Sequence, residues 1–301
     1  MKILLIIFIV LFVILLVLVV FSVGLLRFVT LPKNRVPVDK APEIEKSKDL
    51  WGPYDSYEKV EMNFTMDDGY LIHGTYIPSG EDNKFVIITH GYTYNRLGGV
   101  KYLNIFHELG YNAYIYDIRH HGDNADCYCS MGYKESRDIV NIARLLREKF
   151  GREISIGLHG ESLGAASSLL ALGLDKGFEF CVADCPFTDL SVLLEDLGWS
   201  WFHIPKPLSH LASIASQIVH GYRLDRIRPI DSFKKNTTTP VCFIHGADDK
   251  FILPKHSKAG YEACQQYKEL HLIPGAGHAE SYLYARQEYH NIVSKFLEAI
   301  Y

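Results

Sequence analysis

The fold-deciding stretch is the apolar run Ile154-Ser155-Ile156-Gly157-Leu158-His159, then Gly160-Glu161-Ser162-Leu163-Gly164, then Ala165-Ala166-Ser167-Ser168-Leu169-Leu170. The first run predicts a buried strand, and the small, helix-compatible residues of the last predict a helix. A G-x-S-x-G sequence between a strand and a helix places a serine hydroxyl on a sharp turn above a sheet. The turn presses together the positions two residues to either side of the serine, so only glycine fits there. This pattern predicts Ser162 as a nucleophile, with a glycine-rich turn carrying a surface serine as the alternative.

Strand and helix patterns alternate through most of the chain. A β-hairpin with an Asp-Gly turn is expected within residues 60–77. Further strands are expected at 85–89, 111–116, 154–159, 178–183, 241–245 and 270–273, and helices at 100–109, 134–150, 256–267 and 285–299. Such alternation predicts an α/β protein with a mostly parallel sheet covered by helices on both faces. Active sites of these sheets lie at the carboxyl ends of the strands.

A nucleophilic serine needs a base, and the base needs an acid that orients it. In this architecture the expected chain order is serine, acid, histidine. The sequence offers His245-Gly246-Ala247-Asp248-Asp249 after one predicted strand and Gly275-Ala276-Gly277-His278 after the next. We therefore predict His278 as the base. The spacing favours Asp249 as the acid, and Asp248 is the competing candidate.

The negative charge that develops in acyl transfer is stabilised by two backbone N–H groups. One is expected from Leu163, which follows the nucleophile at a helix N-terminus where the dipole helps. The other is expected from the loop His90-Gly91-Tyr92-Thr93 after the predicted strand 85–89. Gly91 allows the backbone to turn toward the site, so the amide of Tyr92 is the predicted second donor.

Composition limits the other possibilities. The chain has 301 residues, 48% hydrophobic and 22% charged, with a net charge of −4, so electrostatics give no case for nucleic-acid binding. The six cysteines are scattered and are more typical of reduced thiols than of a disulfide framework. His120, His121, Cys127 and Cys129 lie close together, but their spacing matches no common zinc site, so we expect no metal. The chemistry outlined above requires no cofactor.

The N-terminal segment differs from the rest of the chain. Residues 3–26 include no charged side chain, and a helix of this length can cross a bilayer. Residues 1–26 are therefore predicted to form an uncleaved transmembrane anchor, although a cleaved signal peptide would share the pattern. The positive charges on both sides lean only slightly toward a cytoplasmic catalytic domain. Residues 27–50, with three prolines and no periodicity, are expected to form a tether.

The remaining residues, 51–301, are expected to form one domain with an insertion at about 187–238. No strand is evident between Asp184 and Thr239, whereas 208–222 has a helical pattern. We interpret this insertion as a lid in which Trp199 and Trp201 line an apolar contact surface. The alternative is that the two rings only pack the insertion onto the domain.

From about residue 60 to the C-terminus, the chain resembles the α/β-hydrolase family. The resemblance rests on His90-Gly91, on Asp117-Ile118-Arg119-His120-His121-Gly122, on the serine motif, on His245-Gly246-x-x-Asp249 and on Gly277-His278. It implies that Asp117 and Arg119 order the loop near the predicted oxyanion strand. More narrowly, the chain looks like bacterial membrane-anchored hydrolases with prolyl-oligopeptidase-like catalytic domains. That group includes esterases, thioesterases and peptidases.

These observations predict a serine hydrolase that cleaves carboxylic esters or thioesters through an acyl-enzyme on Ser162. The expected partners are a small acyl ester, or alternatively a short peptide, and a membrane. A membrane-tethered serine peptidase is the second hypothesis. A degenerate hydrolase fold that serves as a binding module is the third, and the intact set of serine, acid and histidine argues against it.

Overall fold

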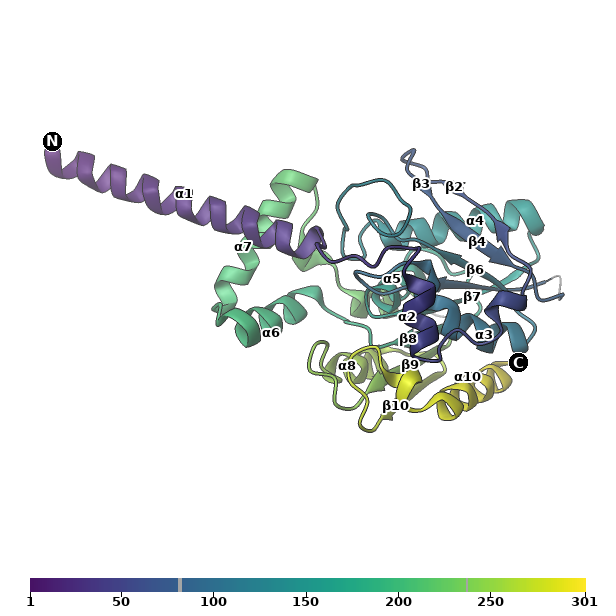
Figure 1. The fold of residues 1–301 in the computed structure, drawn as a ribbon. Coiled ribbons are helices and arrows are strands. Elements are labelled where there is room, and N and C mark those ends of the chain that lie inside the picture. The colour runs from purple at the N-terminus through teal and green to yellow at the C-terminus, as the bar shows by residue number, and fades with distance from the viewer. Residues whose placement is uncertain (81–82, 237) are drawn as a thin grey trace. The chain divides into compact units, whose positions relative to one another are not determined.

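The computed structural model describes residues 1–80, 83–236 and 238–301 (Figure 1). The chain forms two compact units, which are described separately. The larger unit consists of Pro32–Thr188 and Arg228–Tyr301. The smaller unit consists of Met1–Leu31 and Asp189–Ile227, so it combines the N-terminal helix with the insertion.

The larger unit is built on an eight-stranded sheet with the strand order β1-β4-β6-β5-β7-β8-β9-β10. β1, β4 and β6 pair antiparallel, and all pairs from β6 to β10 are parallel. The strands of this sheet are β1 Val60–Glu61, β4 Gly74–Ile77, β5 Lys84–Thr89, β6 Asn112–Tyr116, β7 Ser155–Glu161, β8 Cys181–Asp184, β9 Val241–Gly246 and β10 Lys268–Ile273. The predicted strands from 85 onward are all present.

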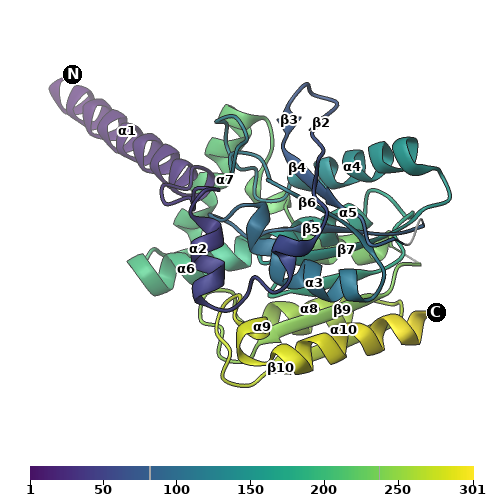
Figure 2. The ribbon, with the colours of Figure 1, turned by 45° about the vertical axis from the view of Figure 1, so that its right-hand side comes forward.

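Helices cover both faces of this sheet, as Figure 2 shows for α3 and α10 on one side and α4 and α5 on the other. The helices of the larger unit are α2 Ala41–Ser47, α3 Val100–Glu108, α4 Glu135–Phe150, α5 Leu163–Leu172, α8 Lys255–Ala263, α9 Ser281–Tyr284 and α10 Arg286–Ile300. Successive side chains of β5 point to opposite faces of the sheet and contact the two layers of helices. Val86 and Ile88 belong to the core shared with α3 and α10, whereas Phe85 packs against Phe150 at the end of α4.

The hairpin expected within residues 60–77 is divided between two sheets. β2 Phe64–Thr65 and β3 Leu71–Ile72 pair antiparallel around the Asp-Gly turn, where Gly69 has a φ of +79°. A residue with a side chain rarely adopts this φ, which explains glycine at the turn. β1 and β4 on either side pair with each other at the edge of the large sheet.

The segment 27–50 is more ordered than a tether, which corrects the sequence-based expectation. The N-terminal helix continues to Thr30, and residues 41–47 form α2. The amide of Val36 donates to the carbonyl of Thr93 at 2.8 Å, and the side chain of Asn95 donates to the carbonyl of Val36 at 3.0 Å. Seven helical residues are too few to show a helical period, so the sequence pattern did not predict α2.

The smaller unit contains the α-helices α1 Lys2–Thr30, α6 Leu190–Phe202 and α7 Lys206–His220 and the short 3-10 helix η3 Leu224–Arg226. α1 is long and apolar enough to cross a membrane, with a mean hydropathy of 4.0 over its most apolar window. Asp189 caps α6 by accepting from the amide of Ser191 at 2.9 Å. The structure therefore has two helices where the sequence indicated one, and among the residues described between Asp184 and Thr239 there is no strand.

Candidate active site

The turn around Ser162 has the geometry that the glycine pattern predicted. β7 ends at Glu161 and α5 begins at Leu163, and Ser162 between them has a φ of +56°. A Cβ atom on Gly160 would lie 2.4 Å from the carbonyl carbon of Gly164, and a Cβ on Gly164 would lie 2.1 Å from the carbonyl oxygen of Thr89. Because backbone atoms cannot move aside cheaply, both glycines are required by the turn.

The structure brings the predicted serine, histidine and acid together. The distance from Ser162 Oγ to His278 Nε2 is 2.9 Å, and that from His278 Nδ1 to Asp249 Oδ2 is 2.7 Å. The three residues come from the loops after β7, β9 and β10. These strands are parallel, so their carboxyl ends meet at one edge of the sheet. Such a chain of hydrogen bonds can pass the serine proton to the histidine.

Asp249, rather than Asp248, carries the carboxylate beside His278. Asp248 is exposed, whereas Asp249 is buried and its Oδ1 accepts from the amides of Phe251 at 2.8 Å and Ile252 at 2.9 Å. Burial alone would raise the pKa of Asp249, but hydrogen bonds from His245 and His278 outweigh it and hold this pKa well below its usual range. Asp249 is thus kept ionised.

The loop expected to supply an oxyanion donor lies against the nucleophile. A Cβ on Gly91 would be 3.6 Å from the Cβ of Ser162. The ring of His90 fixes this loop, because its Nε2 accepts from the amide of Ile118 at 3.0 Å and its Nδ1 donates to the carbonyl of Gly91 at 2.7 Å. Burial lowers the pKa of His90, which keeps the ring neutral as these bonds require.

A second buried histidine, whose role the sequence did not reveal, supports the same loop. His121 Nε2 accepts from the amide of Thr93 at 3.1 Å, and His121 Nδ1 donates to the carbonyl of Arg119 at 2.8 Å. Burial lowers the pKa of His121 to about 3. His120 accepts from the amide of Cys127 at 3.1 Å. Both histidines of this pair therefore serve hydrogen bonds that order loops.

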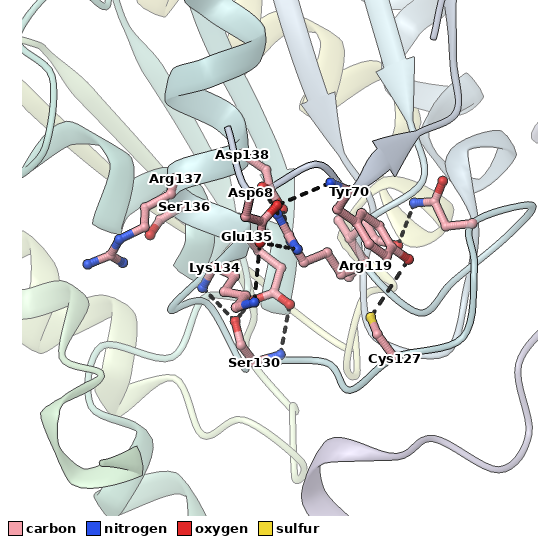
Figure 3. Close-up of polar contacts among 12 residues, drawn as sticks. Asp68, Tyr70, Arg119, Cys127, Ser130, Lys134, Glu135, Ser136, Arg137 and Asp138 are labelled. Atoms are coloured by element: carbon pink, nitrogen blue, oxygen red, sulfur yellow. Dashed lines mark hydrogen bonds and ion pairs between the residues drawn. The ribbon is translucent and has the colours of Figure 1, made fainter. Parts of the chain in front are cut away.

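Asp117 and Arg119 have different tasks. Asp117 pairs with Arg96 and accepts from the amide of Asp123 at 3.0 Å. Arg119 donates to Asp138 at 2.7 Å and to Asp68 at 2.9 Å, as Figure 3 shows. Asp117 therefore orders the loop that follows β6, whereas Arg119 joins the β2–β3 turn to the start of α4.

Glu161, the variable residue beside the nucleophile, belongs to a buried polar cluster. Its carboxylate pairs with Lys101 at 2.6 Å and accepts from the hydroxyl of Tyr102 at 2.6 Å. Burial opposes ionisation of Glu161, but Lys101 outweighs it and lowers the pKa of Glu161. The same tyrosine hydroxyl lies 3.1 Å from Asp184 Oδ2, and Ser281 donates to the other oxygen of Asp184 at 3.0 Å.

The pKa of Asp184 is shifted in the opposite direction to that of Glu161. Burial, together with the nearby charge of Glu161, raises the pKa of Asp184 to about 6. Its carbonyl oxygen accepts from the amide of Ser162 at 2.8 Å, so it also supports the nucleophile turn. Sequence reasoning missed this cluster because its hydrogen-bonded partners are 59 to 97 residues apart in the chain.

Comparison with known proteins agrees with this architecture. An esterase of Pyrococcus furiosus, Pf2001, superimposes with a TM-score of 0.68 and 25% identity, over 83% of this chain and 95% of that chain. The acylaminoacyl peptidase of Pyrococcus horikoshii superimposes with a TM-score of 0.61 and 18% identity, over 80% of this chain and 41% of that chain. The protein is a serine hydrolase with the α/β-hydrolase fold, as the sequence resemblance implied.

Sequence relatives narrow the class to a family. The model of the prolyl oligopeptidase family matches residues 103–300. The uncharacterised protein YqkD of Bacillus subtilis (strain 168) is 32% identical over 262 residues, which cover 85% of each chain. The uncharacterised protein YfhR of Salmonella typhi is 25% identical over 251 residues, or 77% of this chain and 78% of that protein. The chain belongs to the prolyl oligopeptidase family.

Proposed function

We propose that this protein hydrolyses carboxylic esters or thioesters through a catalytic triad of Ser162, His278 and Asp249. The observation that carries the proposal is the continuous hydrogen-bonded chain from Ser162 Oγ to the buried Asp249 carboxylate. The turn that holds Ser162 does not itself require His278 or Asp249, so their alignment with the serine points to catalysis. The similarity to an esterase of Pyrococcus furiosus supports the ester substrate class.

The proposed mechanism is a two-step acyl transfer. His278 Nε2 accepts the hydroxyl proton as Ser162 Oγ attacks the substrate carbonyl, and His278 then gives this proton to the leaving group. Asp249 holds the imidazole in the tautomer with a proton on Nδ1 and stabilises its cationic form. The amides of Tyr92 and Leu163 hold the oxyanion, each contributing roughly 3–4 kcal/mol in comparable sites. Water then hydrolyses the acyl-enzyme with the same groups.

A serine peptidase acting on short peptides is the second candidate function. It is favoured by the match to the prolyl oligopeptidase family and by the similarity of the fold to an acylaminoacyl peptidase. Both reactions use the same nucleophile and base, so the two candidates differ in the leaving group and not in the triad. The choice therefore has to be made with substrates.

The first experiment tests the nucleophile. A fluorophosphonate probe should label the wild-type protein and fail to label Ser162→Ala, because the probe reacts with an activated serine. The variant Ser168→Ala is the matched control, since Ser168 is buried on α5 and only donates to the carbonyl of Gly164. Equal labelling of wild type and Ser162→Ala would refute the proposal. Labelling of neither would favour a catalytically inactive binding module.

The second experiment separates the two candidate substrates. Initial rates are compared for a chain-length series of p-nitrophenyl esters and for aminoacyl anilides, with Ser162→Ala as the blank. For each substrate, kcat/KM is divided by the rate of the uncatalysed hydrolysis. If the protein is an esterase, this ratio should be much larger for the best ester than for the best anilide. Comparable acceleration of both would favour the peptidase.

We also propose that α1 anchors the protein in a membrane. Its 29 residues contain no charged side chain between Lys2 and Arg27, and the side chains of its first two thirds are exposed. A helix with this composition is stable when lipid surrounds it. The protein should therefore remain in the membrane pellet after alkaline carbonate washing, and release into the supernatant would contradict the anchor.

A further inference from the structure

The two helices of the insertion expose large apolar side chains. On α6, Trp199, Trp201 and Phe202 have exposed fractions of 58%, 47% and 55%. On α7, Ile214 and Ile218 are 46% and 79% exposed. A water-facing helix normally presents polar residues on its outer side, so a run of exposed rings and branched chains indicates contact with an apolar partner.

The inner side of α7 is already occupied. Among the residues of α7 whose burial is described, the buried ones are small, namely Ala212, Ser213, Ala215 and Ser216. α7 lies beside α1 in Figures 1 and 2, and Ser213 Oγ accepts from the amide of Asp225 at 3.2 Å. Small residues spaced four apart, such as Ala212 and Ser216, let two helices approach closely, as they do inside membranes. The large apolar side chains of α7 are therefore left for something other than α1.

The length of α1 places this contact at the membrane surface. At about 1.5 Å per residue, a hydrocarbon core of about 30 Å is crossed by about 20 residues. Counted from Ile3, the core ends near Ser22, before the buried residues Leu26 and Thr30. Phe28 contacts Phe202 with ring centroids 5.7 Å apart, so the apolar surface of α1 continues onto α6 at the level of the headgroups.

The exposed rings also fit the water-facing border of a membrane. Residues 197–224 contain no aspartate or glutamate, and the cations of this stretch are paired with acids that flank it. Lys206 lies 3.2 Å from Glu195, and Arg223 pairs with Asp225. Tryptophan is enriched where a bilayer meets water, so Trp199 and Trp201 are suited to that position.

We propose that α6 and α7 lie in the interface of the bilayer that α1 spans, with Trp199, Trp201, Phe202 and Ile218 among the headgroups and the first acyl carbons. The inference rests on the proposed membrane anchor and is independent of the proposed hydrolysis. It makes the insertion a membrane-binding element in addition to the single helix.

Tryptophan quenching tests this directly, because the chain has only three tryptophans and Trp51 lies in the other unit. The full-length variant Trp51→Phe is reconstituted into vesicles of phosphatidylcholine and phosphatidylglycerol that carry bromines at acyl carbons 6 and 7. We expect its emission to fall at least twofold relative to unbrominated vesicles. The control Trp199→Phe/Trp201→Phe retains only the buried Trp51 and should lose less than a fifth.

The outcomes are distinct. Equal, weak quenching in both variants would overturn the proposal, whether or not the chain forms a dimer. If Trp51→Phe does not fold, the difference in quenching between wild type and Trp199→Phe/Trp201→Phe gives the same answer. Flotation of the vesicles tests the anchor separately: protein that does not float refutes the anchor and this inference together. Ser162→Ala should quench like wild type, so failure of the esterase proposal leaves this result unchanged.

Discussion

At the scale of single residues, Asp249 combines the most constraints. It is buried, lies 2.7 Å from His278 Nδ1 and 3.2 Å from His245 Nε2, and accepts two backbone N–H bonds. A buried carboxylate is costly unless such partners satisfy it. The surroundings of Asp249 therefore keep its charge in place to orient one histidine.

We expect Asp249→Asn to lower kcat by about 10⁴-fold with little change in KM. The side-chain amide of asparagine would donate to His278 Nδ1, so the imidazole proton would sit on Nε2. A protonated Nε2 cannot accept the hydroxyl proton of Ser162. Ester hydrolysis measures the loss, and the exposed neighbour Asp248→Asn, expected within twofold of wild type, is the matched control. A loss of less than tenfold in Asp249→Asn would show that another group orients His278.

The site residues that the sequence predicts are those whose chemistry requires one residue type at one place. Ser162, Asp249 and His278 each follow a recognisable strand, so their order and position were readable. Lys101 and His121 were not, because their tasks are defined by partners that only the fold brings near. Lysine and histidine occur in many other settings, and nothing in the local pattern marks these two.

At the scale of elements, the pair Lys101–Glu161 joins α3 to the end of β7 directly behind the nucleophile. The side chains of Lys101 and Glu161 are only 10% and 14% exposed, so each charge depends largely on the other for compensation. Breaking a buried pair by removing one partner typically costs about 3–5 kcal/mol, whereas an exposed pair contributes at most about 1 kcal/mol.

We therefore expect Lys101→Met to lower the free energy of unfolding by about 3–5 kcal/mol, measured by denaturant titration in detergent. The double variant Lys101→Met/Glu161→Gln should recover part of this loss, because it removes the unpaired charge. Arg144→Met is the matched control, since Arg144 pairs with Glu148 on the exposed side of α4. Equal losses from the buried and the exposed pair would contradict this account.

Element boundaries show where sequence patterns stop being informative. The strands and helices predicted from residue 85 onward are present with bounds within a few residues, because alternation and strand hydrophobicity are local signals. α2 and α6 did not stand out. α2 has only seven residues, and α6 carries apolar residues on several sides, so neither shows a clear helical face.

At the scale of the whole molecule, three buried neutral histidines contribute to the dependence of stability on pH. Burial lowers the pKa of His121 and of His159 to about 3 and also lowers that of His90. Unfolded histidine has a pKa of about 6.5, so between about pH 6.5 and pH 3 the unfolded chain binds more protons. Their contribution to stability is fully present above this window and is lost as the pH falls through it.

At pH 5 this difference amounts to about 2 kcal/mol for each of His121 and His159. We expect His159→Gln to reduce the change in unfolding free energy between pH 7.5 and pH 5 by about that amount. The exposed His203→Gln should leave the change as it is in wild type. Asp184 acts in the opposite sense, since its raised pKa of about 6 favours the folded state at low pH, and it is common to all three proteins. An unaltered pH dependence in His159→Gln would contradict the prediction.

The division of the chain into two units has a practical side for protein engineering. The smaller unit is formed by two separate segments, Met1–Leu31 and Asp189–Ile227. Deleting only the N-terminal segment would expose the side of α7 that contacts α1, and the remaining helices would be prone to aggregate. The cut ends of the larger unit meet, because the carbonyl of Thr188 accepts from the amide of Ile230 at 3.0 Å. A double excision that starts the chain at Pro32 and bridges Thr188 to Arg228 with a short glycine-serine link should therefore yield a water-soluble hydrolase body suitable for crystallisation.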